Sequence, residues 1–305
     1  MKKILVKGYG SIGRRHAANL KFLGYEPVIL TSQNTEEIPY MSISKWSELP
    51  TVKEAIICSE TRDHLRDLVD CQEAGINKIL LEKPLYTEPL SGDQYNNFKK
   101  IEIFLAYNMK FLKCFKLIQD YLKENGHQIK KVNIYCGQYL PDWRPGRDYR
   151  TTYSAIKSRG GGVHLDLSHE LDYMLWLFGK PERYHVFKDS ISDLEIDSCD
   201  CFTGYYYYTK LSGKFVSLVE LDYIKNDTDR RLSIYSEDAE DLFCDFIAET
   251  VQIKRGKQVI KEYKDKNLFD FDESYRQELI DFLSDKPEIL TTLEEGQQVM
   301  ELIQG

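Results

Sequence analysis

The most constraining feature of this sequence is a glycine-rich turn close to its start. The apolar residues 4–6 run directly into Gly-Tyr-Gly-Ser-Ile-Gly at residues 8–13, and a helical pattern follows. In such a turn Gly8 allows the chain to reverse, Gly10 lets the backbone approach a pyrophosphate, and Gly13 lets the helix pack closely on the strand. The helix N-terminus offers N–H groups and the positive end of its dipole to the phosphates. The pattern predicts a dinucleotide-binding turn, and a turn of purely architectural value is the alternative.

Short apolar runs recur through the first third of the chain. After residues 4–6 they are residues 28–30, 55–58, 79–81 and 103–106. Runs that are continuous rather than alternating are typical of parallel strands covered on both faces. The segments between them have helical periodicity, as at Ile12, His16, Leu20 and Leu23. We therefore predict an α/β fold that begins with a doubly wound parallel sheet of the Rossmann type.

The pattern changes after residue 111. We expect helices at residues 110–123, 163–178, 273–283 and 292–303, and strands at residues 132–136, 205–208, 215–221, 232–235 and 250–253. The β-branched and aromatic strands predict an antiparallel sheet, and the four tyrosines at 205–208 are interpreted as a sheet surface. We divide the chain into a Rossmann domain, residues 1–118, and an α+β substrate and oligomerisation domain, residues 119–305. The last helices could pack back on the first domain.

Composition excludes several classes of protein. The net charge of −8 argues against a nucleic-acid-binding protein, because such domains are basic. No stretch approaches the ~20 apolar residues of a membrane helix, and the first apolar run is too short for a signal peptide. The seven cysteines are scattered, with only Cys199 and Cys201 close together, which is weak evidence for a metal site. We expect a cytoplasmic protein with no metal and no membrane partner.

The end of the second apolar run bears on the choice of cofactor. NAD-selective sites place Asp or Glu there to accept hydrogen bonds from the 2′-hydroxyl of the ribose. This sequence has Thr31 and Ser32 instead, and the first acid is Glu36. Nothing there would repel a 2′-phosphate, and Arg14 or Arg15 could bind one. The pattern slightly favours NADP over NAD.

A lysine follows the fourth run in the tripeptide Glu82-Lys83-Pro84. Ligands of an open parallel sheet bind beyond the carboxyl ends of its strands, so Lys83 points toward the cofactor. A lysine there can hydrogen-bond a substrate hydroxyl and take its proton as hydride leaves the carbon. The alternative is a solvated surface charge.

A second cluster of polar residues follows the three glycines at 160–162. Asp166, His169 and Asp172 are three residues apart and would lie near one face of a helix. A histidine with carboxylate neighbours can act as an acid or a base near neutral pH. The same residues could instead bind a metal, or form a polar face at a domain interface.

Together these motifs resemble the glucose–fructose oxidoreductase/inositol dehydrogenase family (Gfo/Idh/MocA). The resemblance covers essentially the whole chain. It rests on the glycine turn, Ser59-Glu60-Thr61 with His64, the Glu-Lys-Pro tripeptide, Tyr107-Asn108, and the glycine-led helix with Asp166, His169 and Asp172. The combination of the tripeptide with that helix is its most specific part.

The resemblance implies roles for particular residues. Lys83 and His169 would be catalytic, with Asp166 as the partner of His169. The residues that would line the cofactor are Gly8, Gly10, Ser11, Ile12, Gly13, Ser59, His64 and Glu82, with Asn108 near the nicotinamide. The family usually has its aspartate four residues before the histidine, whereas Asp166 is three before His169 and position 165 is Leu. The resemblance also implies a second domain with a large, mostly antiparallel open sheet that forms homodimers or homotetramers.

An arginine-rich loop lies between the strand at 132–136 and the glycine-led helix. Arg144, Arg147 and Arg150 fall within seven residues of an otherwise acidic protein. Guanidinium groups suit carboxylates and phosphates, so we expect an anionic sugar as substrate, such as a nucleotide sugar, a uronic acid or a nonulosonic acid. Alternatively, Asp142 and Asp148 neutralise these arginines and order the loop.

We therefore expect an NAD(P)-dependent oxidoreductase acting on a secondary hydroxyl or ketone of a sugar, in surface-polysaccharide or nonulosonic-acid metabolism. Two alternatives remain open. One is a cofactor-binding sensor without turnover. The other is a lyase or glycosidase that uses bound NAD transiently with no net redox change.

Overall fold

The computed structural model describes residues 1–210, 213–237 and 240–305. It divides into two compact units. The first consists of Met1–Asn108 with Asp272–Met300, and the second of Met109–Phe271 with Glu301–Gly305. Residues 109–118, which the sequence division assigns to the Rossmann domain, belong to the second unit. Most of the last two helices belongs to the first.

The first unit is built on a sheet whose strand order is β15-β6-β5-β4-β1-β2-β3. Its strands are β1 Lys3–Lys7, β2 Glu26–Leu30, β3 Met41–Ile43, β4 Glu54–Ile57, β5 Lys78–Glu82, β6 Glu102–Ala106 and β15 Thr291–Thr292. All pairs are parallel except β15 with β6. The five apolar runs become β1, β2, β4, β5 and β6, and their central residues are fully buried except Phe104 of β6, which is partly exposed.

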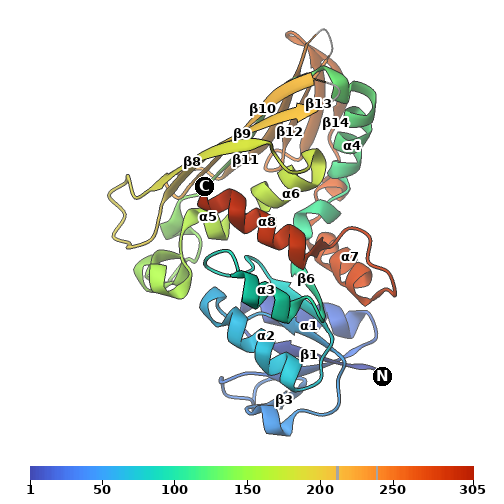
Figure 1. The fold of residues 1–305 in the computed structure, drawn as a ribbon, viewed down its shortest axis with the longest axis vertical. Coiled ribbons are helices and arrows are strands. Elements are labelled where there is room, and N and C mark those ends of the chain that lie inside the picture. Colours follow the sequence, from blue (N-terminus) through green and yellow to red (C-terminus); the bar gives the residue numbers. More distant parts are fainter. Residues whose placement is uncertain (211–212, 238–239) are drawn as a thin grey trace. The chain divides into compact units, whose positions relative to one another are not determined.

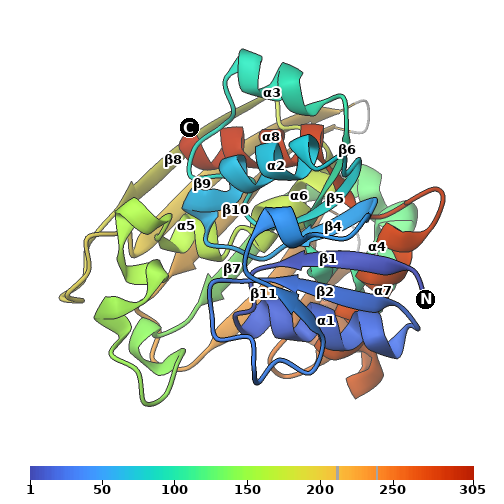
Figure 2. The same ribbon diagram turned by 90° about the horizontal axis from the view of Figure 1, so that it is seen from below.

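Helices cover both faces of this sheet. They are α1 Ser11–Phe22, α2 His64–Glu73, α3 Gly92–Phe98, α7 Phe271–Leu283 and α8 Leu293–Gln304. Figure 2 shows α1 on one side of β1 and β2, and α2 on the other. The doubly wound parallel sheet predicted from the sequence is confirmed.

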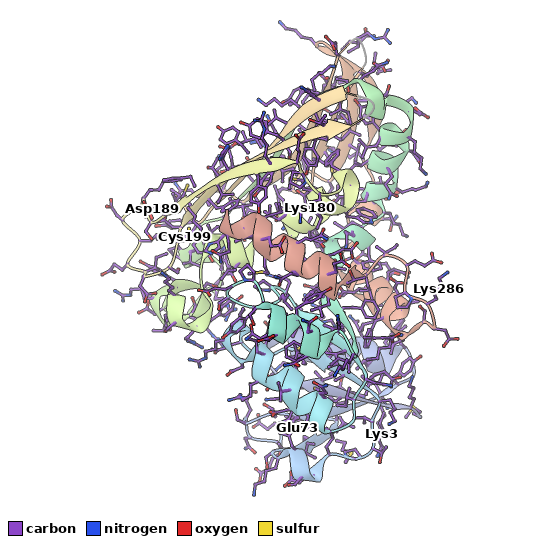
Figure 3. The ribbon with its side chains drawn as sticks, in the orientation of Figure 1. Lys3, Glu73, Lys180, Asp189, Cys199 and Lys286 are labelled. Carbon is purple, nitrogen blue, oxygen red and sulfur yellow. The ribbon has the colours of Figure 1, made fainter. Side chains whose placement is uncertain are left out.

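The second unit is built on a larger sheet with strand order β14-β13-β12-β11-β7-β10-β9-β8 (Figure 1). Its strands are β7 Ile129–Gly137, β8 Arg183–Asp189, β9 Cys201–Lys210, β10 Gly213–Asp222, β11 Asp229–Ser236, β12 Asp241–Asp245, β13 Thr250–Arg255 and β14 Gln258–Tyr263. Every pair is antiparallel except β7 with β10. The long hairpin of β8 and β9 closes near Asp189 and Cys199, which are labelled in Figure 3.

Among the described residues, three α-helices lie wholly within the second unit: α4 Cys114–Asn125, α5 Val163–Asp166 and α6 His169–Phe178. Phe115 of α4 and Tyr173 of α6 are buried and pack against each other and against Phe246, with ring centroids 5.2–6.3 Å apart. This aromatic cluster is the part of the core that joins both helices to the sheet.

One local prediction is wrong and a second holds only in part. The single helix expected at residues 163–178 is two helices, because Leu167 leaves helical geometry (φ −100°, ψ 28°) and the Ser168 hydroxyl donates to the Leu165 carbonyl (2.9 Å). The tyrosines at 205–208 alternate across β9, so Tyr206 and Tyr208 are buried while Tyr205 is 46% exposed. Only one side of that run is surface.

Candidate active site

The glycine turn between β1 and α1 has the geometry of a phosphate cradle. Gly8 has φ +94°, and a Cβ atom there would lie 2.8 Å from the Cys58 carbonyl oxygen. A Cβ on Gly13 would lie 2.2 Å from the Gly8 oxygen, so α1 can pack this closely only with glycine. Gly10 differs, because nothing lies within 4 Å of its Cβ position.

The N-terminus of α1 is therefore open to a ligand. Gly10 is the N-cap residue, no side chain caps the helix, and the first turn has no acidic residue. Ser11 is exposed and Ile12 is partly exposed beside it. Uncapped N–H groups at the positive end of a helix dipole, in front of open space, fit a pyrophosphate.

The end of β2 gives mixed evidence on the 2′-position of the ribose. Thr31 is buried, and its hydroxyl oxygen accepts a hydrogen bond from the Gln33 amide (3.2 Å), whereas Ser32 is exposed. Arg15 pairs with Asp272 (3.2 Å), but the Arg14 guanidinium lies 5.0 Å from the centre of the Tyr9 ring. Of the two arginines, Arg14 keeps its charge available for a phosphate.

Two buried histidines organise the ends of β4 and β5. His16 Nε2 lies 2.8 Å from Glu82 Oε1, and both side chains are buried. His64 Nδ1 lies 3.0 Å from the Pro84 oxygen, and its Nε2 lies 3.3 Å from the Ser59 oxygen. Burial lowers the pKa of His64. Because its two ring nitrogens face backbone carbonyl oxygens of Pro84 and Ser59, His64 connects the segment after β4 to the segment after β5.

Lys83 directly follows the last residue of β5, and its side chain is partly exposed. The peptide bond from Lys83 to Pro84 is cis. Asn108 is buried, and its amide donates to the Ser274 hydroxyl (2.7 Å) of α7. The residues expected to line a cofactor thus follow β1, β4, β5 and β6 at the carboxyl edge of one parallel sheet, which is where ligands of such sheets bind.

In the second unit, Asp166 is a buried carboxylate held by tyrosines. The Tyr223 hydroxyl donates to Asp166 Oδ2 at 2.6 Å, and both side chains are buried. Burial and the Asp166 charge raise the pKa of Tyr223. The charge of Asp166, followed by burial, raises the pKa of Tyr153. Both phenols therefore remain neutral donors beside this carboxylate, and no local sequence pattern identifies either tyrosine.

His169 is the first residue of α6, a helix anchored by two buried ion pairs. Asp172 Oδ1 lies 3.3 Å from Lys110 Nζ. Glu170 receives two hydrogen bonds from the Arg230 guanidinium of β11, at 2.6 and 2.9 Å. Asp166 and Asp172 thus bond to different elements. Within the described residues, no group of three His, Cys, Asp or Glu side chains is arranged to hold a metal ion.

The three loop arginines have different surroundings. Arg150 forms hydrogen bonds to Asp148 (2.9 Å) and to Glu195 (2.8 Å). Arg144 lies over the ring of Tyr153, with its Cζ 5.5 Å from the ring centre, and Arg147 is exposed. In the described ranges of the chain, no carboxylate forms an ion pair with Arg144 or Arg147. Neutralisation by acidic neighbours therefore applies to Arg150 alone.

Solved structures share this architecture. A levoglucosan dehydrogenase in complex with NADH has a TM-score of 0.78 at 16% identity, over 99% of this chain and 95% of that one. The WlbA dehydrogenase from Bordetella pertussis, solved with NADH and UDP-GlcNAcA, has a TM-score of 0.79 at 13% identity, over 99% and 93%. A myo-inositol 2-dehydrogenase from Lactobacillus plantarum has a TM-score of 0.75 at 14% identity, over 99% and 95%.

The chain has the fold of these dehydrogenases. The fold that the family resemblance implies is therefore confirmed along the whole chain. No protein-family model and no curated protein sequence matches it. In the part of the chain that the structure describes, no helix is long and apolar enough to cross a membrane.

Proposed function

We propose that the chain is an NAD(P)-dependent oxidoreductase that interconverts a secondary hydroxyl and a ketone of a sugar. The observation that carries the proposal is the open, uncapped N-terminus of α1 behind Gly10, in a fold shared with NADH-bound dehydrogenases. Gly8, Gly10, Ser11, Ile12 and Gly13 would hold the pyrophosphate. Thr31 and Ser32 would face the ribose, where the lack of an acid slightly favours NADP over NAD.

A bound nicotinamide would exchange a hydride with the carbon that carries the reacting oxygen. Lys83 hydrogen-bonds that oxygen and takes or returns its proton, and His169 serves as the second acid–base group. Asp166, which Tyr223 holds by a hydrogen bond, would be the partner of His169 and supply a negative charge to it. Ser59, His64, Glu82 and Asn108 shape the nicotinamide end.

We assign recognition of an anionic or nucleotide-linked sugar to Arg144 and Arg147. Neither guanidinium is paired with a carboxylate in the described residues, and a guanidinium suits a phosphate or a carboxylate. Two dehydrogenases with this fold are linked to nucleotide sugars: WlbA was solved with UDP-GlcNAcA, and the other is a UDP-N-acetylglucosamine 3-dehydrogenase from Acidithiobacillus ferrooxidans. Arg150 is committed to Asp148 and Glu195, so its role is to order the loop.

The proposal extends to assembly and location. The outer face of the larger sheet exposes apolar side chains such as Phe187 (53%) and Tyr205 (46%), which suits a homodimer or homotetramer formed through this face. All seven cysteines are free thiols, which suits the cytoplasm. Light scattering on the purified protein would test the assembly.

Cofactor binding is the first test. NADH and NADPH are titrated by tryptophan fluorescence into the wild type, Gly10→Glu and Gly92→Glu. Gly92 is a matched control, because nothing lies within 4 Å of its Cβ position and it belongs to the same unit. We expect binding by the wild type and Gly92→Glu, and a loss of at least ~30-fold (about 2 kcal/mol) for Gly10→Glu. Failure of the wild type to bind either cofactor would overturn the proposal.

Substrate class is the second test. Nucleotide sugars and uronic acids are screened for NAD(P)⁺ reduction, and the active compound is assayed with Arg144→Ala and Arg150→Ala. We expect KM to rise at least ~10-fold for Arg144→Ala and to change little for Arg150→Ala. A larger effect of Arg150→Ala would reverse the assignment. Turnover without net reduction of bound cofactor would indicate a lyase or glycosidase instead.

A further inference from the structure

We propose that His16 is a positioning residue for the cofactor site: from α1 it fixes the Glu82 carboxylate, and with it the nicotinamide end of the site. The inference rests on the proposed function. It names a residue outside the glycine turn and outside the Glu-Lys-Pro tripeptide, and it assigns that residue a task that local sequence patterns do not reveal.

His16 lies three residues beyond Gly13 and is fully buried. A polar ring costs free energy in an apolar interior unless it is hydrogen-bonded, and its partner is Glu82, 66 residues away, with Nε2 2.8 Å from Oε1. The other ring nitrogen, Nδ1, is buried and has no hydrogen-bond partner among the described residues. In the neutral ring the proton therefore belongs on Nε2, which makes His16 the donor and Glu82 the acceptor.

The orientation of the ring is also set from its other side. Tyr275 of α7 packs edge-on against His16, with ring centroids 5.9 Å apart and planes at 81°. Arg15 in turn stacks on Tyr275 at 4.7 Å and pairs with Asp272. His16 is thus held between α7 and the end of β5, and it cannot leave Glu82 without disturbing this packing.

The hydrogen bond matters because Glu82 is buried and a second carboxylate, that of Glu278, acts on the same neighbouring thiol. Burial raises the pKa of the neighbouring Cys58 thiol, and the negative charges of Glu82 and Glu278 raise it further. Both carboxylates are therefore close enough to this thiol to affect its pKa. Glu82 is only 8% exposed, and water cannot readily replace His16 as a donor. Without His16 the Glu82 carboxylate would lose this donor and reorient, in the residue that precedes Lys83.

The strand order tells which end of the cofactor would be affected. In a dinucleotide-binding sheet the adenosine ribose binds at the end of β2. Here β2 lies on one side of β1 and its glycine turn, and β4 and β5 lie on the other side. Glu82, as the last residue of β5, therefore belongs with the nicotinamide half rather than with the adenosine half. His16 should influence binding of the whole cofactor but not binding of its ADP-ribose portion.

The experiment compares affinities for NADH and for ADP-ribose, which lacks the nicotinamide. The variants are His16→Leu, His16→Gln, whose amide can reproduce the Nε2 donor, and Leu20→Ala, a cavity in the same buried face of α1. We expect His16→Leu to weaken NADH at least ~10-fold while ADP-ribose changes less than ~2-fold, and His16→Gln to recover most of the NADH affinity. Leu20→Ala should lower the thermal midpoint and leave the ratio of the two affinities unchanged.

Several outcomes would overturn the inference. An unchanged ratio in His16→Leu, or a ratio altered equally in Leu20→Ala, would show that His16 is an ordinary core residue. If His16→Leu does not fold, His16→Asn replaces it, since its shorter side chain cannot span the distance to Glu82, and the same ratio decides. A wild type that binds ADP-ribose but neither NADH nor NADPH would overturn this inference and leave the glycine turn intact, whereas one that binds none of the three would overturn the proposed function as well.

Discussion

The ion pair between Arg230 and Glu170 gives the sharpest prediction for stability. Glu170 is fully buried on α6, and Arg230 of β11 is 9% exposed. The two side chains make parallel hydrogen bonds of 2.6 and 2.9 Å. Glu170 adjoins His169, so this pair links the candidate catalytic helix to β11 of the sheet. We examine three variants: Arg230→Met, Glu170→Met, and the double variant.

The expected magnitudes follow from burial. Arg230→Met leaves a carboxylate with no access to water, and removing one partner of a buried pair costs about 3–5 kcal/mol. Glu170→Met should cost somewhat less, because Arg230 keeps a little access to solvent. Replacing both charges with apolar side chains of similar size removes the uncompensated charge, so the double variant should lie within ~1 kcal/mol of the wild type.

Urea unfolding followed by tryptophan fluorescence measures these differences. Trp176 lies on α6 itself and Trp143 lies in the loop before it, so two of the three tryptophans report the second unit, whereas Trp46 belongs to the first. The dependence of the unfolding free energy on urea should keep the same slope in all variants, so that shifts of the midpoint convert directly into energy. A single variant that costs under 1 kcal/mol, or a double variant that costs the sum of the singles, would refute the reasoning.

Three further predictions concern single sites. Burial raises the pKa of Asp67, although Lys7 (3.8 Å) and Arg66 oppose it, so the folded state holds this proton more tightly than the unfolded chain. Ionised Asp67 therefore destabilises the folded state above its folded pKa but not below the unfolded pKa of ~3.9. Asp67→Asn should raise the urea midpoint at pH 7 and leave it unchanged at pH 3. A lower midpoint at pH 7 would mean that the attraction of Lys7 outweighs the cost of burial. Gly13→Ala should lower the free energy of unfolding by about 1–3 kcal/mol, because its Cβ would lie 2.2 Å from the Gly8 oxygen. Gly10→Ala has open space around its Cβ and should change the thermal midpoint little. Equal losses of stability in the two variants would contradict the close packing of α1. Tyr223→Phe removes a donor from the buried Asp166 carboxylate and should cost about 1–3 kcal/mol. This is more than we expect for Tyr206→Phe, because the Tyr206 hydroxyl donates to the neutral Leu302 carbonyl; the reverse order in urea unfolding would contradict the importance of the Tyr223–Asp166 hydrogen bond.

Backbone features of the fold were predictable because their causes are local. Continuous apolar runs marked all five central strands of the first sheet, since a strand covered on both faces must be apolar at every position. Three strands that were not predicted, β3, β8 and β14, lack this signal. β14 is exposed at five of its six positions, and β3 has only three residues, so neither needs a distinctive pattern. β8 alternates between exposed and partly buried positions with charged residues at both ends.

The break between α5 and α6 shows where periodicity misleads. Asp166, His169 and Asp172 have the spacing of one helical face, and the sequence predicted a shared function on that basis. The chain instead leaves the helix at Leu167, and the two aspartates bond to Tyr223 and Lys110. Those partners are 57 and 62 residues away in sequence, on other elements. No local pattern encodes such a pairing, because it depends on the order of strands in the sheet.

The loop arginines and His16 extend the same argument to function. Three arginines in one loop predicted a single anionic site, yet Arg150 is neutralised by Asp148, two residues away, and by Glu195, 45 residues away. His16 looked like one more position on an amphipathic helix, yet it donates to the carboxylate next to Lys83. Residue type and spacing identify which groups can do chemistry. Topology decides which of these charges are already paired and which buried donors fix the end of a strand. The structure therefore changes the choice of residues to mutate more than it changes the proposed reaction.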